Sequence, residues 1–307
     1  MKKLIKFGIA TIVFFGSYAT IAQQLPQFTQ YMYNTISINP AYAGSRETLS
    51  IVALHRNQWV GVSDAPTTTT ISIHSPLRNE KVGLGFSFIQ DDLLDNFSYL
   101  YADFSYTLNV GAETKLALGL KGGFTHFGLD SELRQDPGVA SDPTIANLEN
   151  QWNPNIGIGA YLHTNRWYLG LSAPRLLKSD YNDSNNVKVL ERVGYYFTGG
   201  LVFDISKMTK FKPAFLVKIT NGAPISYDLS ANFLFNEKFW LGAAYRINNE
   251  TGAIAAMTDY QISKQLRIGY TFEYSTSDIN NFSDGTHEIL LMFEVFKSKS
   301  VKSPRYF

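Results

Sequence analysis

The chain has 307 residues, enough for one domain or two, and no run of one charge or residue type divides it into halves. Lys and Arg number 27 against 26 Asp and Glu, so the totals indicate neither a nucleic-acid partner nor an acidic substrate. The lack of cysteine excludes a disulfide scaffold, a Cys-ligated zinc site, a thiol nucleophile and a lipid anchor on an N-terminal Cys.

Residues 1–22 are predicted to be a secretory signal peptide. Three lysines precede an apolar stretch over residues 7–18, and small residues then lead to a predicted cleavage site after Ala22. The other interpretation is a membrane anchor, but the apolar stretch is shorter than the roughly 20 residues that a spanning helix needs. No later stretch is long and apolar enough to span, so we expect the mature chain to pass into the periplasm or beyond.

Residues 23–47 form a separate segment before the first predicted strand. Within it, residues 25–46 are too polar, and too often interrupted by proline, to span lipid. We therefore expect this segment to lie in the lumen of a barrel or on its periplasmic rim. A plug or barrel staple and a docking site for a partner both remain open as its role.

From residue 48 to 296, apolar and small or polar side chains alternate with period two, as in strands whose faces differ. Over 82–88, for example, Val, Leu and Phe share one face while Gly and Ser share the other. The pattern predicts about fourteen strands, most with the roughly 9–11 residues that a tilted strand needs to cross a bilayer. They cover residues 48–57, 67–75, 82–90, 98–109, 114–127, 154–163, 166–172, 193–206, 210–220, 225–235, 239–248, 252–262, 265–275 and 286–296.

Apolar and polar side chains also alternate in the strands of a large soluble β-sandwich. The lengths of the connections between strands distinguish such a sandwich from a membrane barrel. Every second connection between predicted strands is mostly tight, such as those near residues 164–165 and 263–264. The connections between these include the long polar stretches 128–153, 173–192 and 276–285. Short turns on one rim and long loops on the other are typical of outer-membrane barrels, in which the short turns face the periplasm. We therefore predict an all-β, antiparallel transmembrane barrel in the outer membrane.

Charged side chains within the predicted strands lie opposite the apolar face, which would place them in the lumen. The candidate lumen-facing charged residues are Asp204, Lys212, Lys218, Asp228, Arg246, Asp259, Arg267 and Glu273. They predict a lumen that is wet or filled by polar groups. Pro213 has no N–H for a ladder, so we expect its strand to begin at or after it.

No constellation of catalytic or metal-binding residues stands out. The five histidines are scattered over different strands with no pair at metal-ligand spacing, which favours structural or lumen roles. Residues 180–186 are rich in oxygen ligands, yet they lack the ordered spacing of a calcium loop. We therefore expect a protein that is not an enzyme and that needs no cofactor.

Several motifs together resemble those of the PorP/SprF family of type IX secretion system outer-membrane proteins. They are Pro26 to Asn34, Ser37 to Gly44, His55 to Gly61, Ser72 to Leu77, Phe239 to Arg246, Arg267 to Tyr270, Gly285 to Ile289 and Lys302 to Phe307. The resemblance spans the mature chain and is weakest in the loops 128–153 and 173–192. The last of these motifs, from Lys302, lies in a basic C-terminal tail over residues 297–307.

The resemblance implies a non-enzymatic role with secreted surface proteins that carry a C-terminal sorting domain, such as gliding adhesins. It also implies contact with outer-membrane lipid, the secretion machinery and a periplasmic peptidoglycan-binding protein. The family motifs suggest candidate partner-docking or plug residues, namely Asn39, Pro40, Ala41, Tyr42, Gly44, Arg56, Asn57, Gln58, Trp59 and Gly61. A rival hypothesis, supported by the polar lumen face alone, is an uptake pore for small solutes.

Overall fold

The computed structural model describes residues 22–23, 26–92, 95–129, 151–178, 190–248 and 252–295. Most of the predicted signal peptide, the tail 297–307 and most of the loops 128–153 and 173–192 lie outside these residues. Two short helical elements, α2 (Thr35–Ile38) and η1 (Pro40–Tyr42), precede the main strands, and η2 (Asp278–Asn281) precedes the last one. In the described residues, no helix has the length and apolar character needed to span a membrane.

The strands follow the alternating segments of the sequence. They are β2 (Leu49–Asn57), β3 (Thr67–Pro76), β4 (Val82–Asp92), β5 (Asp95–Asn109), β6 (Lys115–Leu129), β7 (Gln151–His163), β8 (Trp167–Ala173), β10 (Gly194–Leu201), β11 (Phe203–Asp204), β12 (Thr209–Thr220), β13 (Ser226–Phe235), β14 (Phe239–Ile247), β15 (Gly252–Gln261), β16 (Leu266–Ser275) and β17 (Thr286–Val295). A short parallel pair, β1 (Ala22–Gln23) with β9 (Leu190–Glu191), lies apart from this sheet.

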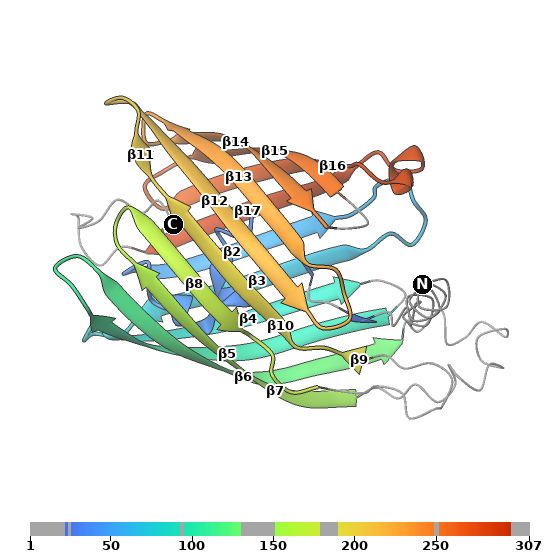
Figure 1. Cartoon of the computed structure of the whole chain (residues 1–307), viewed down its shortest axis with the longest axis horizontal. Helices are drawn as coiled ribbons and strands as arrows, with labels where there is room; N and C mark the ends of the chain where they lie inside the picture. Colours follow the sequence, from blue (N-terminus) through green and yellow to red (C-terminus); the bar gives the residue numbers. More distant parts are fainter. Residues whose placement is uncertain are drawn as a thin grey trace, which may run out of the picture.

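The sheet closes on itself. Each strand pairs antiparallel with its neighbours along the chain, and β17 pairs with β2, so the last strand meets the first. With β10 and β11 counted as one strand, the described residues form a closed barrel of fourteen strands (Figure 1). The predicted fold class and strand number are confirmed. Closure leaves no sheet edge in lipid, where unpaired backbone groups would cost several kcal/mol each.

The prediction for Pro213 is wrong, because β12 begins four residues earlier, at Thr209. The pairs Gly200 with Ala214 and Phe203 with Phe211 keep one register on both sides of the proline. Proline lacks an N–H, so the ladder is interrupted opposite it and the partner strand divides into β10 and β11. The proline thus removes a hydrogen bond without shifting the strand.

The two ends of the barrel differ in their connections. We call the end with the short connections 77–81, 110–114, 164–166, 205–208, 236–238 and 262–265 the turn rim. The opposite end, with residues 58–66, 276–285 and the connections after β6 and β8, is the loop rim. Three further connections at the loop rim, 93–94, 221–225 and 248–251, are short. The predicted alternation therefore holds for the turn rim and in part for the loop rim.

The outward face of the wall is apolar and is bordered by aromatic side chains at both ends. Those near the loop rim are Trp152, Tyr195, Tyr227, Tyr245 and Tyr274, and those near the turn rim are Tyr106, Phe203, Phe239 and Tyr260. Aromatic girdles of this kind mark the two membrane interfaces of outer-membrane barrels. The outward face is therefore suited to lipid.

Residues 26–48, which we call the lumen plug, lie inside the barrel and include α2 and η1 (Figure 1, blue). Phe28, Tyr31, Met32 and Ile38 of the plug pack in one buried cluster with inward-facing wall residues such as Leu290. The expectation that only polar groups fill the lumen is therefore wrong in part. The plug brings its own apolar side chains and completes a hydrophobic core that the wall alone does not have.

Candidate functional site

The lumen plug runs the length of the barrel interior. At one end the side chain of Gln27 donates to Asp228, near the start of β13 at the loop rim. At the other end the guanidinium of Arg46 lies 2.7 Å from the carboxylate of Glu294, near the turn rim. Because β2 starts at the turn rim, the plug enters the barrel there and its N-terminal end lies at the loop rim.

An Asn-Pro pair sets the bend at the middle of the plug. The side-chain oxygen of Asn39 accepts a hydrogen bond of 3.0 Å from the backbone N–H of Ala41, which caps η1. Pro40 occupies the first helical position, where its missing N–H has no cost. The amide of Asn39 also donates to the carbonyl of Ala160 at 3.0 Å, so one residue ends α2, begins η1 and attaches the plug to β7.

Glycines in the wall create room for this part of the plug. The carbonyl of Ala43 lies against Gly83, and the backbone of Ala41 lies against Gly119. A Cβ at either glycine would come closer to plug backbone atoms than real Cβ atoms come to any neighbour. The slim inward face of β4 and β6 is therefore the surface against which the plug packs.

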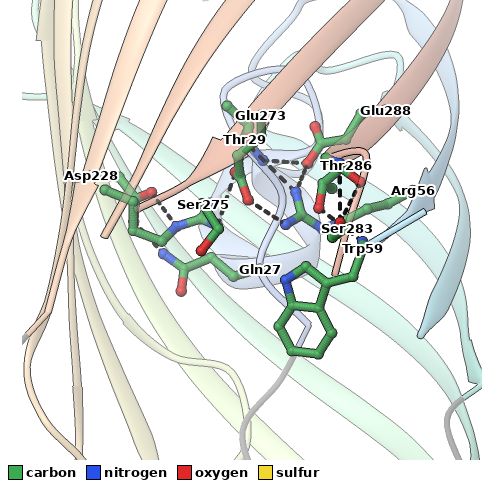
Figure 2. A network of polar contacts seen from close by, with 12 residues as sticks. Gln27, Thr29, Arg56, Trp59, Asp228, Glu273, Ser275, Ser283, Thr286 and Glu288 are labelled. Atoms are coloured by element: carbon green, nitrogen blue, oxygen red, sulfur yellow. Dashed lines mark hydrogen bonds and ion pairs between the residues drawn. The ribbon is translucent and has the colours of Figure 1, made fainter. Parts of the chain in front are cut away.

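At the loop end, the plug contacts a group of buried charges, Arg56, Asp228, Arg246, Glu273 and Glu288, which we call the charged cluster (Figure 2). The guanidinium of Arg56 pairs with both Glu273, at 2.8 Å, and Glu288. The guanidinium of Arg246 pairs with Asp228 at 2.7 Å and with Glu273 at 3.1 Å. Two cations thus hold three carboxylates from β13, β16 and β17.

The plug supplies the donors that offset the excess negative charge of the cluster. The backbone N–H groups of Thr29 and Gln30 donate to the two oxygens of Glu288, at 2.7 Å and 3.1 Å. The hydroxyl of Thr29 donates to Glu273 at 2.7 Å. Buried charges stabilise a fold only when hydrogen bonds satisfy them. The cluster and the loop end of the plug therefore stabilise each other.

Polar contacts continue along the lumen toward the turn rim. The hydroxyl of Tyr33 donates to the carboxylate of Asp259 at 2.6 Å, and Arg267 lies 3.5 Å from the same carboxylate. The cations of Lys212 and Arg267 lie 5.8 Å and 5.4 Å from the ring centre of Tyr33. Cations near aromatic faces are attracted electrostatically, which favours Tyr33 at this position.

The turn end of the plug is attached to three strands. Besides the pair of Arg46 with Glu294, Lys115 contacts Glu47 at 2.5 Å. The backbone N–H of Gly44 donates to Nδ1 of His74 at 3.1 Å, and Gly44 adopts a left-handed backbone with φ of 75°. Glycine adopts such a conformation without steric cost, which explains its place at the last turn before β2.

Two connections join above the seam between β2 and β17, and we call residues 58–66 and 276–285 the loop clasp. The backbone N–H of Val60 donates to Gly285 at 2.8 Å, and that of Asp284 donates back to Val60 at 2.7 Å. Trp59 has a left-handed backbone with φ of 50°, and its N–H donates to the hydroxyl of Thr286 at 3.1 Å. The clasp is therefore an ordered part of the loop rim, and Trp59 lies beside the charged cluster (Figure 2).

The predicted docking or plug residues fall into three places. Asn39, Pro40, Ala41 and Tyr42 are buried in the lumen, with Gly44 following at the turn rim. Arg56 belongs to the charged cluster. Asn57 ends β2, and Gln58, Trp59 and Gly61 lie in the loop clasp. The motif is therefore part plug, part plug contact and part surface loop.

The predicted lumen charges are brought together with one exception. Lys212, Lys218, Asp228, Arg246, Asp259, Arg267 and Glu273 line the lumen around the plug. Asp204 pairs with Lys210, so the alternation along the strands assigns it to the inward face. It nevertheless lies at the turn rim, with a side chain that is 40% exposed. Its lumen assignment is wrong, because a strand's last residues leave the enclosed interior even when the alternation continues.

Sequence reasoning missed several lumen charges. On β17, Glu288 and Glu294 lie next to the outward-facing residues Ile289 and Phe293. The alternation of the two faces could therefore have assigned both glutamates to the lumen. Lys121 and Asp103 form a buried pair at 2.8 Å across β5 and β6, where the same parity applies. Arg46 had no such signal, since it lies outside the strands.

The geometry defines the class of protein, which is an outer-membrane β-barrel whose lumen is filled by its own N-terminal segment. The family model of the type IX secretion system membrane protein PorP/SprF matches residues 20–293. The chain therefore belongs to the PorP/SprF family, a family of membrane barrels associated with type IX secretion and not of enzymes. No curated protein matches the sequence.

Solved structures similar to the chain include outer-membrane proteins of low sequence identity. The Acinetobacter baumannii outer membrane protein Omp33 is 8% identical with a TM-score of 0.49, and the match covers 81% of this chain and 100% of that one. The CymD monoaromatic hydrocarbon channel is 13% identical with a TM-score of 0.49, covering 87% and 92%. The KdgM porin is 8% identical with a TM-score of 0.40, covering 80% and 99%.

Proposed function

We propose that this barrel supports the export or surface attachment of proteins with a C-terminal sorting domain, such as gliding adhesins. In this proposal it works with the type IX secretion machinery and links it to a periplasmic peptidoglycan-binding protein. Membership of the PorP/SprF family supports the association with type IX secretion. The signal peptide would be cleaved after Ala22, before the barrel inserts into the outer membrane.

The filled lumen is the observation that carries this proposal over an uptake pore. Ala41 and Asn39 of the plug are fully buried, and polar contacts hold the plug at both ends. A solute would have to displace a core of packed side chains, whereas an attachment protein needs only its two rims. The barrel then acts as a fixed platform in the membrane.

The two rims suggest where the two kinds of partner bind. Short turns of outer-membrane barrels face the periplasm, so the turn rim would meet the peptidoglycan-binding protein. The loop clasp, with Gln58 and Trp59, would then face outward and meet the secreted client. Ordered loops are favourable for docking, because little conformational entropy is lost on binding.

Site-specific photo-crosslinking in intact envelopes tests this arrangement. A crosslinker at Gln58 in the loop clasp should capture a large secreted surface protein. The matched variant, with the crosslinker at Lys207 in the turn rim, should instead capture a periplasmic peptidoglycan-binding protein. Capture of barrel-assembly factors alone at both positions would contradict the proposal.

Conductance distinguishes the attachment role from the pore. The full-length protein in planar bilayers should give no steady current, because the plug closes the lumen. A variant with the charged cluster disrupted should give intermittent current as the loop end detaches. Steady conductance of the unaltered protein, scaling with lumen charge, would favour the pore.

A further inference from the structure

The outward face of the barrel has a hollow near the turn rim that the function above does not use. Its volume is about 430 Å³, and it extends over β8, β10, β12 and β13. Its walls are the outward side chains Trp167, Leu169, Leu201, Phe215 and Leu229. A hollow of this size lies in the range of small-molecule sites, about 300–1,000 Å³.

A glycine among large side chains lies next to the hollow. Gly199 pairs with Leu169 on β8 and with Phe215 on β12, both of which point outward. It therefore occupies an outward position without a side chain of its own. A Cβ there would lie 2.7 Å from the ring of Phe215 and 2.9 Å from Leu169, so these two side chains close over the glycine. The hollow lies beside them, toward Leu201 and Trp167.

Cationic side chains lie at the turn-rim end of the hollow. Arg166 directly precedes Trp167, and its side chain is 60% exposed. Arg166 and Lys210 share the carboxylate of Asp204, each at 2.7 Å, and Lys207 lies in the adjoining turn. Lys210 also pairs with Glu237 at 3.4 Å. Three cations against two carboxylates leave a small local positive charge at the turn rim, on the side of the membrane interface.

We propose that this hollow is a binding site for one phospholipid of the leaflet next to the turn rim. An acyl chain fills the space between Trp167, Leu201 and Phe215, and the phosphate contacts Arg166 and Lys207. The occupant is a lipid because the lining faces the membrane and is apolar, while the charge at its end complements a phosphate. Trp167 lies between the two, where indole rings prefer the interface.

The shape of the hollow favours retention of a lipid. On an open stretch of apolar wall, lipids exchange freely. A recess surrounds an acyl chain on several sides and increases its dispersion contacts. Contacts from both chain and phosphate then make one lipid stay after the others are removed.

Native mass spectrometry of the full-length protein in mild detergent, titrated with phosphatidylglycerol, tests this proposal. The unaltered protein should retain one lipid. Leu229→Trp fills the recess and should weaken retention about tenfold, as expected when the contacts of several methylene groups are lost. Arg166→Gln combined with Lys207→Gln should weaken retention about threefold, as expected for exposed charge contacts.

Matched variants separate the site from general effects. Leu201→Trp fills the same hollow from β10, so it should also weaken retention and decides the test if Leu229→Trp does not fold. Ala243→Trp adds the same side chain to an outward position of β14 outside the hollow and should retain the lipid. Unchanged retention in both filling variants, or an equal loss in Ala243→Trp, would overturn the proposal.

Discussion

The two ends of the lumen plug combine charge and close packing differently. At the loop end, Thr29 and Gln30 donate hydrogen bonds to carboxylates of the charged cluster. Toward the turn end, the ion pair of Arg46 with Glu294 is joined by close packing, because Ala41 and Ala43 lie directly against Gly119 and Gly83. The comparison teaches that one chain segment can be held by charge at both rims, with close packing against wall glycines added near one of them.

This difference has a consequence for how the plug detaches. Hydrogen bonds to buried charges are strong while every partner is present and become costly when one partner is lost. Close packing fails only when atoms overlap or a void opens. The loop end should therefore respond mainly to changes of charge, and the turn end to changes of volume as well as of charge.

Arg56→Leu tests the electrostatic end and should have the largest effect. It leaves Glu273 and Glu288 without their shared guanidinium, and removing one partner of a buried ion pair costs about 3–5 kcal/mol. We expect a lower free energy of unfolding, measured in detergent by denaturant titration. Protease sensitivity near residue 28 should rise at the same time, since the loop end of the plug is released.

Two matched variants sharpen this test. Arg56→Lys keeps the charge but loses the fork of donors, so it should lose less stability than Arg56→Leu. Asp204→Asn removes a charge from the exposed turn rim and should leave the unfolding free energy unchanged. If Asp204→Asn and Arg56→Leu destabilise equally, the cluster has no special role in holding the plug.

Gly119→Ala tests the steric end with a single added methyl group. Its Cβ would overlap the backbone of Pro40 and Ala41, and overpacking of this kind costs about 1–3 kcal/mol. Gly122→Ala, three residues along the same strand, is the control because no atom lies within 4 Å of its Cβ. Thermal unfolding should distinguish the two variants, and equal melting temperatures would contradict the packing of the plug on β6.

Trp59→Ala should have the smallest effect on stability and a visible one on function. The hydrogen bond of Trp59 to Thr286 uses the backbone, so the loop clasp persists without the indole. We expect normal heat-modifiable migration of the barrel with surface display of the client lowered several-fold. Trp152→Ala, which removes an outward aromatic ring from the wall, is the control, and normal display in Trp59→Ala would end the docking role of this residue.

Much of the wall could be predicted because alternation is a local property. A strand that faces lipid on one side must place its apolar residues at every second position, whatever the rest of the chain does. That rule located the strands and most of the inward charges, such as Lys212 and Glu273. The prediction for Asp204 was wrong because alternation along a strand does not tell how close a residue lies to the rim. The prediction for Pro213 was wrong because the neighbouring strands hold β12 in register even without the N–H of the proline.

The sequence by itself therefore determined a closed membrane barrel with one apolar and one polar face. Only the tertiary structure decided what fills the lumen, in which direction the plug runs and which charges meet. Arg56 and Glu288, for example, come together because β2 and β17 close the sheet, and Thr29 joins them through the lumen. Contacts between residues so far apart in the chain leave no local pattern, because they depend on closure and on complementary packing.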